Sequence, residues 1–254
     1  MRFSINMETV FRDIPMEKAF ETLHLLGYDT FERWRVPPED IACVQALMQT
    51  YGMHMSLCCP DFFTMNDPAV HDEYEASLHR VFDTLRQLNC RHLVTQVGQD
   101  RGVSRQGQHD AIVRCLRRVA PLLEARGYVL LVEPLNDVRD HKGYYLTSSH
   151  EGFDIIREVN SPSVRLLYDI YHQLHMGEDV QAQIASNLDL IGHFHMAGFP
   201  ERDDRIYEGY DYRPLFAYMN RENVQACMGV ELFTGTLKNA EALLESLQTY
   251  ATAL

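Results

Sequence analysis

The chain alternates short apolar runs with longer segments of helical periodicity, and this alternation strongly limits its fold. Eight runs have the length of strands: Arg2–Asn6, Thr30–Trp34, His54–Cys58, His92–Val97, Val129–Glu133, Arg165–Asp169, Gly192–Met196 and Cys227–Leu232. Strands that alternate one by one with helices form a parallel sheet, and eight such pairs are expected to close into a barrel. The sequence therefore predicts an α/β fold, a (β/α)8 TIM barrel in one domain over residues 1–254.

Segments with apolar residues at helical spacing lie between these runs. They are Met16–Leu26, Pro38–Tyr51, His71–Leu88, Arg105–Arg126, a segment from Ser148 or Ser149 to Val159, Glu178–Leu188, Tyr212–Met219 and Leu237–Tyr250. An open doubly wound sheet is the alternative, but no glycine-rich dinucleotide turn follows the first run. The irregular stretch Cys59–Val70 contains two prolines. We predict that it forms a loop over the barrel mouth, where active sites of this fold lie.

The bulk properties exclude several classes of protein. The 254 residues are 46% hydrophobic, which is ample for the core of one such domain. A formal net charge of −13 argues against binding to nucleic acid or an anionic membrane, because polyanions repel such a chain. No apolar run approaches the ~20 residues of a membrane span. The residues after Met1 lack a signal-peptide pattern and the six cysteines lack metal spacing, so we expect a cytoplasmic protein with reduced thiols.

Four of the later runs each end in a side chain that commonly binds metal ions. These residues are Glu133, Asp169, His195 and Glu231, at successive separations of 36, 26 and 36 residues. Each separation is close to the roughly 30 residues of a strand-helix-strand unit, so the four side chains are expected to meet at one end of the barrel. Three carboxylates and one imidazole suit Mn²⁺, Mg²⁺ or Co²⁺ better than a structural zinc ion. The pattern predicts an enzyme with one divalent metal ion that acts on a small oxygenated substrate.

Each of these positions also has a structural interpretation. A carboxylate that ends a buried apolar strand is costly unless it is paired or metal-bound, so Glu133 could instead be a salt-bridged structural residue. His193 and His195 lie two apart and therefore face the same side of their strand. We assign the metal to His195, which is nearer the strand's C-terminal end, and predict that His193 is a hydrogen-bonding neighbour one layer deeper or a substrate contact.

Three further polar residues lie near the predicted barrel mouth. His172 could hydrogen-bond a substrate, hold a metal ligand in place or simply pack in its loop. Arg202 could bind a substrate carboxylate or phosphate through its guanidinium, or be a solvated loop residue. Glu32 ends the second run and could bind substrate or pair with a neighbouring arginine. We assign His172, Arg202 and Glu32, together with His193, to substrate binding.

The strand ends resemble those of a known family. Glu133-Pro-Leu-Asn136, Asp169-Ile-Tyr-His172, Gly192-His-Phe-His195 and Gly229-Val-Glu231 are similar to the xylose-isomerase-like TIM-barrel sugar isomerases and epimerases. Within that superfamily the sequence most resembles the hydroxypyruvate isomerases and the 2-oxo-tetronate isomerases. The segments Gly27-Tyr-Asp-Thr-Phe-Glu32 and Pro200-Glu-Arg202 support this subgroup.

The resemblance implies a metal site and a mechanism. It implies that Glu133, Asp169, His195 and Glu231 bind one divalent ion, with Glu133 and Glu231 as the acid/base pair. It further implies proton transfer through a cis-enediolate on a small sugar or 2-oxo acid. By the same analogy, His172 and Arg202 hold the substrate, and the chain forms a homodimer or homotetramer.

Two departures leave the substrate open. Leu232-Phe-Thr stands where hydroxypyruvate isomerases often have Tyr-Lys-Pro, which removes a basic group. Many of those enzymes have glutamine where His195 stands, whereas histidine is similar to the ketose 3-epimerases. A ketose 3-epimerase, an inosose-type sugar dehydratase and a non-catalytic metal-binding barrel therefore remain alternatives. A DNA-repair endonuclease of the superfamily is disfavoured, because it would need a basic groove and this chain is acidic.

Overall fold

Short parallel strands form the centre of the molecule. Among residues 1–252, which the computed structural model describes, nine strands pair side by side in the order β3-β2-β1-β9-β8-β7-β6-β5-β4. Their bounds are β1 (Phe3–Asn6), β2 (Thr30–Glu32), β3 (His54–Met55), β4 (Leu57–Cys58), β5 (His92–Thr95), β6 (Val129–Val132), β7 (Val164–Asp169), β8 (Ile191–Met196) and β9 (Met228–Val230). Every pair is parallel, as the alternation of strands and helices predicts.

The two ends of this order belong to one interrupted strand. β3 and β4 are separated by Ser56 alone, and together they cover the predicted strand His54–Cys58. β3 pairs with β2 through Thr30 and His54, whereas β4 pairs with β5 through Leu57 and His92. The eight predicted strands are therefore present and the sheet closes into the predicted barrel, with one break that the sequence did not indicate.

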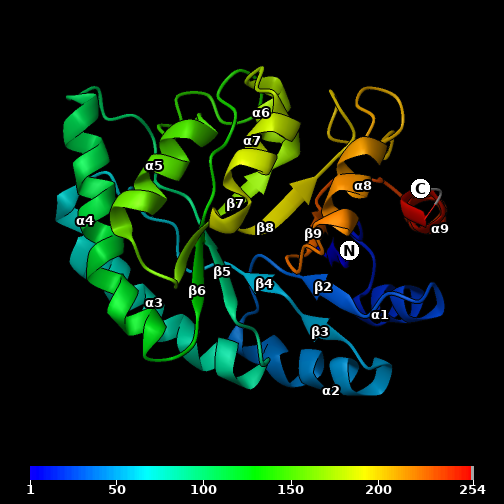
Figure 1. Cartoon of the computed structure of the whole chain (residues 1–254). Helices are drawn as coiled ribbons and strands as arrows, with labels where there is room; N and C mark the ends of the chain where they lie inside the picture. Colours follow the sequence, from blue (N-terminus) through cyan, green and yellow to red (C-terminus); the bar gives the residue numbers. More distant parts are fainter. Residues whose placement is uncertain (253–254) are drawn as a thin grey trace.

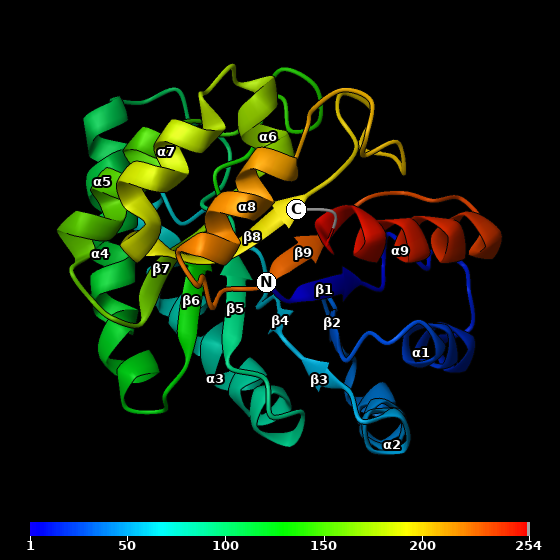
Figure 2. The ribbon, with the colours of Figure 1, turned by 45° about the vertical axis from the view of Figure 1, so that its right-hand side comes forward.

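Helices surround this barrel (Figure 1). They are α1 (Met16–Leu25), α2 (Ile41–Tyr51), α3 (His71–Gln87), α4 (Arg105–Glu124), α5 (Ser149–Val159), α6 (Ile170–His175), α7 (Val180–Asn187), α8 (Arg213–Arg221) and α9 (Leu237–Thr252). Short 3₁₀ turns occupy Pro38–Asp40, Pro68–Val70 and Leu188–Leu190. Eight helices match the predicted segments, and α6 is additional. Between β8 and α8 a long loop extends away from the barrel (Figure 2). No helix within residues 1–252 is long and apolar enough to cross a membrane.

Local sequence signals set the helix ends. Gly52 adopts a left-handed conformation with φ 65° and ends α2, a conformation that glycine adopts without steric cost. The Ser104 hydroxyl accepts a hydrogen bond from the Gly107 N–H at the start of α4. Asp169 caps the unpredicted α6 by accepting a hydrogen bond from the His172 N–H. This cap turns the chain into a helix immediately after β7.

The barrel interior is divided into an apolar side and a polar side. Alternate residues of a strand point into the barrel. On β4 to β7 these positions form an apolar cluster that includes Leu57, Val94, Leu131 and Leu167. On β8, β9, β1 and β2 the residues in phase with the strand ends are His193, Gly229, Ser4 and Thr30. The interior is therefore packed with hydrocarbon beneath one half of the strand ends and with polar or small residues beneath the other half.

Candidate metal and substrate site

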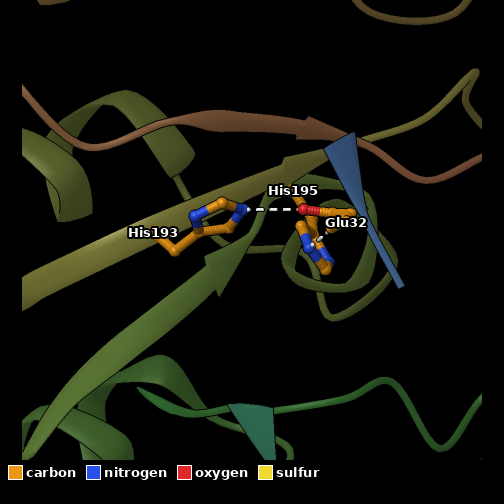
Figure 3. Close-up of side chains that lie close together, drawn as sticks. All are labelled: Glu32, His193 and His195. Carbon is orange, nitrogen blue, oxygen red and sulfur yellow. Dashed lines mark hydrogen bonds and ion pairs between the residues drawn. The ribbon is translucent and has the colours of Figure 1, made fainter. Parts of the chain in front are cut away.

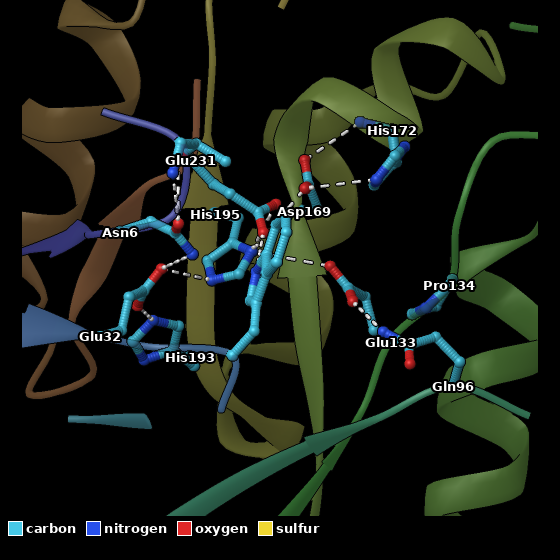
Figure 4. Close-up of polar contacts among 12 residues, drawn as sticks. Asn6, Glu32, Gln96, Glu133, Pro134, Asp169, His172, His193, His195 and Glu231 are labelled. Atoms are coloured by element: carbon cyan, nitrogen blue, oxygen red, sulfur yellow. Dashed lines mark hydrogen bonds and ion pairs between the residues drawn. The ribbon is translucent and has the colours of Figure 1, made fainter. Parts of the chain in front are cut away.

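Four side chains from consecutive strands converge at one end of the barrel (Figure 4). Glu133 directly follows β6, Asp169 ends β7, His195 is the penultimate residue of β8, and Glu231 directly follows β9. All four are buried, and one ligand atom from each lies within 4.8 Å of the others. The structure thus brings together the quartet that the spacing of the strand ends predicts.

The His195 ring lies among the three carboxylates. Its Nδ1 atom is 3.6 Å from Glu133 Oε1, 3.8 Å from Asp169 Oδ2 and 3.4 Å from Glu231 Oε2. This nitrogen is fully buried and has no hydrogen-bond partner. Burial alone would lower the pKa of His195, but the surrounding Glu32 and Glu231 carboxylates raise it well above its ordinary value. The centre of the quartet therefore attracts positive charge, and its set of oxygens and one nitrogen fits a divalent cation.

Glu231 is held by two donors. The Trp34 indole N–H donates to Oε1 at 2.8 Å, and the Arg202 guanidinium donates to Oε2. Burial would raise the pKa of Glu231, but Arg202 and His195 more than offset this effect and hold the pKa well below its ordinary value. Arg202 also lies over the Tyr171 ring, 5.4 Å from its centroid. This carboxylate is therefore ionised and tightly oriented.

The other two carboxylates have different surroundings. Glu133 Oε2 accepts a hydrogen bond of 3.2 Å from the Gln96 amide. Asp169 Oδ1 accepts the His172 N–H, which leaves Oδ2 facing His195. Burial raises the pKa of Asp169 despite the nearby His195 and Arg202 charges. The three carboxylates thus differ in the groups that donate hydrogen bonds to them, although they lie at the same end of the barrel.

His172 has one free donor in this site. Its Nδ1 atom accepts from the Asn136 side-chain amide at 2.7 Å, so the neutral ring carries its proton on Nε2. Burial, followed by the Arg202 charge, lowers the pKa of His172 to about 3 and keeps the ring neutral. Nε2 lies 3.6 Å from Asp169 Oδ2 and has no hydrogen-bond partner. An unpaired buried donor beside the quartet is what a substrate hydroxyl or carbonyl oxygen would satisfy.

Glu32 and His193, which the sequence assigned to substrate binding, lie elsewhere. Both are buried, and neither lines the cavity at the quartet. Glu32 Oε2 is 3.1 Å from His193 Nε2, and Glu32 Oε1 is 3.1 Å from His195 Nε2. Burial raises the pKa of Glu32, but His195 and His193 more than offset this and lower it to about 2. These two residues contact the far side of His195 and each other, one layer deeper, where the sequence also placed His193.

A cavity of about 420 Å³ opens onto the quartet. The described residues that line it are Trp34, Cys59, Phe62, Phe63, Thr64, Val94, Gln96, Gly98, Gln99, Glu133, Leu135, His141, Tyr144, His172, His195, Arg202 and Glu231. The volume suits a small molecule. Cys59 to Thr64 belong to the stretch predicted as a loop over the barrel mouth, and that prediction is confirmed.

Several residues that line the cavity were not predicted from the sequence. Gln96 directly follows β5, so the strand-end rule that found the quartet would also have found it. Trp34 was not assigned to the site, because the sequence gives no indication of where its indole N–H points. His141 and Tyr144 lie in the long connection between β6 and α5, where strand spacing carries no information.

The comparison with known sequences identifies the family. The sequence model of the xylose isomerase-like TIM barrel family matches residues 20–252, and the chain belongs to this family. The hydroxypyruvate isomerase of Escherichia coli (strain K12) is 26% identical over 165 residues, which cover 65% of this chain and 64% of that protein. The name of this relative supports the predicted class of enzyme, an isomerase.

Solved structures show the same fold. A protein of Brucella melitensis described as AP endonuclease, family 2, superposes with a TM-score of 0.88 at 21% identity, covering 98% of both chains. The 3-keto-D-glucoside 4-epimerase of E. coli superposes with a TM-score of 0.84 at 20% identity, covering 99% of both chains. At these identities the likeness concerns the fold, and the chemistry must be argued from the site.

Proposed function

We propose that this protein is a divalent-metal-dependent isomerase or epimerase that acts on a small sugar or 2-oxo acid. The observation that carries the proposal is the convergence of Glu133, Asp169, His195 and Glu231 around an unpaired, buried His195 Nδ1. These four residues would hold one Mn²⁺, Mg²⁺ or Co²⁺ ion. When bound, the ion supplies a Lewis acid that stabilises negative charge on substrate oxygens.

The residues of the chain divide the proton chemistry between them. One glutamate of the pair Glu133 and Glu231 takes the proton from the carbon beside the substrate carbonyl, which gives a cis-enediolate. A proton then returns to the neighbouring carbon in an isomerase, or to the opposite face of the same carbon in an epimerase. His172 Nε2–H donates to a substrate oxygen. A substrate oxygen that takes over the Arg202 guanidinium would free Glu231 Oε2 for proton transfer.

A neutral keto sugar is a better candidate substrate than a 2-oxo acid such as hydroxypyruvate. Among the described residues that line the cavity, Arg202 is the only arginine and there is no lysine. That guanidinium already binds Glu231. A substrate carboxylate would therefore have to compete with a buried carboxylate for the same cation. The relatives include both isomerases and epimerases. The pairing of Arg202 with Glu231 favours the ketose epimerase alternative.

Solvent deuterium incorporation tests the proposal. The protein is incubated in D₂O with Mn²⁺ or Mg²⁺ and a panel of ketoses, keto-glycosides, 2-oxo acids and inososes. Exchange at a carbon beside a carbonyl, followed by NMR and abolished by a chelator, would support enediolate chemistry and identify the substrate class. Loss of water from an inosose would establish the dehydratase alternative instead. A protein that binds metal but exchanges no compound in the panel would contradict the proposal.

Substitution of the acid/base pair gives an independent check. Glu133→Gln and Glu231→Gln are each expected to abolish turnover, because an amide cannot accept the substrate proton. Glu151→Gln is the matched control, since Glu151 lies in α5 and bonds Arg105 and Tyr145. Near-full activity in either test variant would remove that residue from the pair.

A further inference from the structure

Glu32 and His193 lie close to His195 and have no role in the chemistry described so far (Figure 3). Glu32, at the end of β2, is fully buried, and so is His193 on β8. Asn6, at the end of β1, is also buried and lies 3.5 Å from Glu32 Oε1 through its side-chain amide. Burying a carboxylate and an imidazole in a barrel core is expensive unless the two groups are paired and hydrogen-bonded.

The orientation of His195 links this layer to the quartet. Its Nδ1 faces Glu133, Asp169 and Glu231. Its Nε2 lies 3.1 Å from Glu32 Oε1, although the two atoms do not form a hydrogen bond in this structure. A histidine that binds a metal ion through one ring nitrogen must carry its proton on the other nitrogen. Such histidines usually donate that second N–H to a carboxylate or carbonyl, which fixes the tautomer and the ring plane. Glu32 is placed to accept the Nε2–H of His195.

The carboxylate of Glu32 is itself immobilised. Its Oε2 pairs with His193 Nε2 at 3.1 Å, and Asn6 is tied down because its Oδ1 accepts hydrogen bonds from the Thr9 N–H and hydroxyl. Gly229 on β9 completes the arrangement. A Cβ atom there would lie 2.4 Å from His195 Cδ2 and 2.9 Å from Glu32 Oε1, so a larger residue would displace the pair.

We propose that Glu32 is a positioning residue for His195, with His193 holding Glu32 from below. It acts on the metal site through the His195 ring and does not touch the substrate. The proposal rests on the proposed function, because it assigns His195 to a metal ion. Glu32, His193 and His195 could alternatively form a second cation site, since their ligand atoms also lie within 4.8 Å of one another. That arrangement would require His195 to lose both ring protons and Glu32 to give up His193, so the positioning role is favoured.

Metal affinity tests the role of Glu32 apart from catalysis. Chelator-treated wild-type protein and the Glu32→Gln variant are titrated with Mn²⁺, and the free ion is followed by electron paramagnetic resonance. The variant is expected to bind Mn²⁺ roughly 10- to 100-fold more weakly, the usual effect of losing the partner of a metal-binding histidine. Glu178→Gln is the matched control. Glu178 accepts hydrogen bonds from Ser149 and lies outside the quartet and its cavity, so its substitution should leave the dissociation constant unchanged.

A second readout separates positioning from general stability. In ¹H,¹⁵N NMR of the Mg²⁺-loaded wild-type protein with ¹⁵N-labelled histidine, the Nε2–H proton of His195 should be strongly deshielded by its carboxylate acceptor. Glu32→Gln should weaken this deshielding, because an amide oxygen is a poorer acceptor than a carboxylate. If Glu32→Gln does not fold, Glu32→Asp replaces it. That variant keeps the charge but draws the carboxylate away from Nε2, so its Mn²⁺ affinity should also fall.

The outcomes are distinguishable. Wild-type protein that binds one Mn²⁺ ion, with equal affinity in Glu32→Gln, would overturn the positioning role and leave the proposed function intact. Two ions in the wild type and one in the variant would overturn it in favour of the second cation site. Wild-type protein that binds no Mn²⁺, Mg²⁺ or Co²⁺ would overturn the proposed function and this inference together.

Discussion

The buried ion pair of Arg202 and Glu231 allows a quantitative test of the electrostatics of the site. Their side chains are 15% and 6% exposed, so both charges are largely removed from water. Arg202→Met keeps much of the side-chain volume and removes the guanidinium. Glu231 then stays buried near Asp169 and retains the Trp34 indole as a donor. We therefore expect the metal-free variant to be destabilised.

The size of the effect follows from the burial. Removing one partner of a buried ion pair typically costs about 3–5 kcal/mol, because the other charge is left uncompensated. In a chain of this length each 1 kcal/mol lowers the melting temperature by about 2–4 °C. Metal-free Arg202→Met should therefore unfold about 10 °C below the wild-type protein at neutral pH.

The effect has a defined dependence on pH. In the wild-type protein Arg202 holds the pKa of Glu231 well below the ordinary value of 4.5. This stabilisation is present above pH 4.5 and is lost as the pH falls through the lower folded-state pKa. Without Arg202, burial raises the pKa of Glu231 and the carboxyl group accepts a proton more readily. The difference between the two proteins should therefore be largest at neutral pH and shrink toward pH 4.

Urea unfolding of chelator-treated protein at several pH values measures this difference. Arg139→Met is the matched control, because Arg139 pairs with Glu201 on the surface and solvent screens that pair. The control should unfold like the wild-type protein. Equal stability of Arg202→Met and wild type at pH 7, or a difference that does not change with pH, would refute the reasoning.

Three further predictions concern other parts of the site and the barrel. Trp34→Phe removes the indole donor to Glu231, and a lost hydrogen bond to a charged group, worth about 1.5–3 kcal/mol, should lower kcat/KM roughly 10- to 100-fold in a steady-state assay. Burial, followed by the neighbouring His193, lowers the pKa of His92 from 6.5 to about 4. The folded protein therefore loses stability as the pH falls from 6.5 toward 4. In urea titrations, the decrease in the free energy of unfolding between pH 6.5 and 5 should be about 2 kcal/mol smaller for His92→Gln than for the wild-type protein. Mn²⁺ at about 100 times its dissociation constant should stabilise the wild-type protein by about 2.7 kcal/mol, and a melting temperature unaffected by Mn²⁺ and by chelator would argue against the metal site.

The barrel could be predicted from the sequence because several independent features of the sequence indicate the same strands and helices. Apolar runs, helical stripes and residues such as Gly52 all mark the same element boundaries. Two features were missed for local reasons. The third strand breaks at Ser56, whose hydroxyl bonds Ser4 across the barrel at 2.6 Å, a contact that strand propensity does not encode. The helix α6 begins because Asp169, which the sequence predicts as a metal ligand, also caps it.

The quartet was predictable and the surrounding contacts were not. Parallel strands end at the same edge of a barrel, so spacing alone places Glu133, Asp169, His195 and Glu231 together. Depth within the barrel depends on the stagger between strands, which sequence spacing does not give. Glu32 was therefore expected at the height of the quartet but contacts His193 and the lower side of His195. The structure thus buries Glu32 away from the cavity, although the sequence assigned it to substrate binding.

The barrel interior is apolar on one side and polar on the other, and this difference bears on the role of Glu32. Barrel interiors are usually filled by layers of bulky apolar side chains, and β4 to β7 follow that rule with Leu131, Leu167 and their neighbours. Beneath His195 the same layer contains Glu32 and His193 instead, although hydrocarbon of similar volume would often be neutral or stabilising there. Local rules of folding are mainly broken where function requires it. A carboxylate retained in the core, bonded on one side to His193 and facing His195 on the other, is therefore best explained by the ring that it orients.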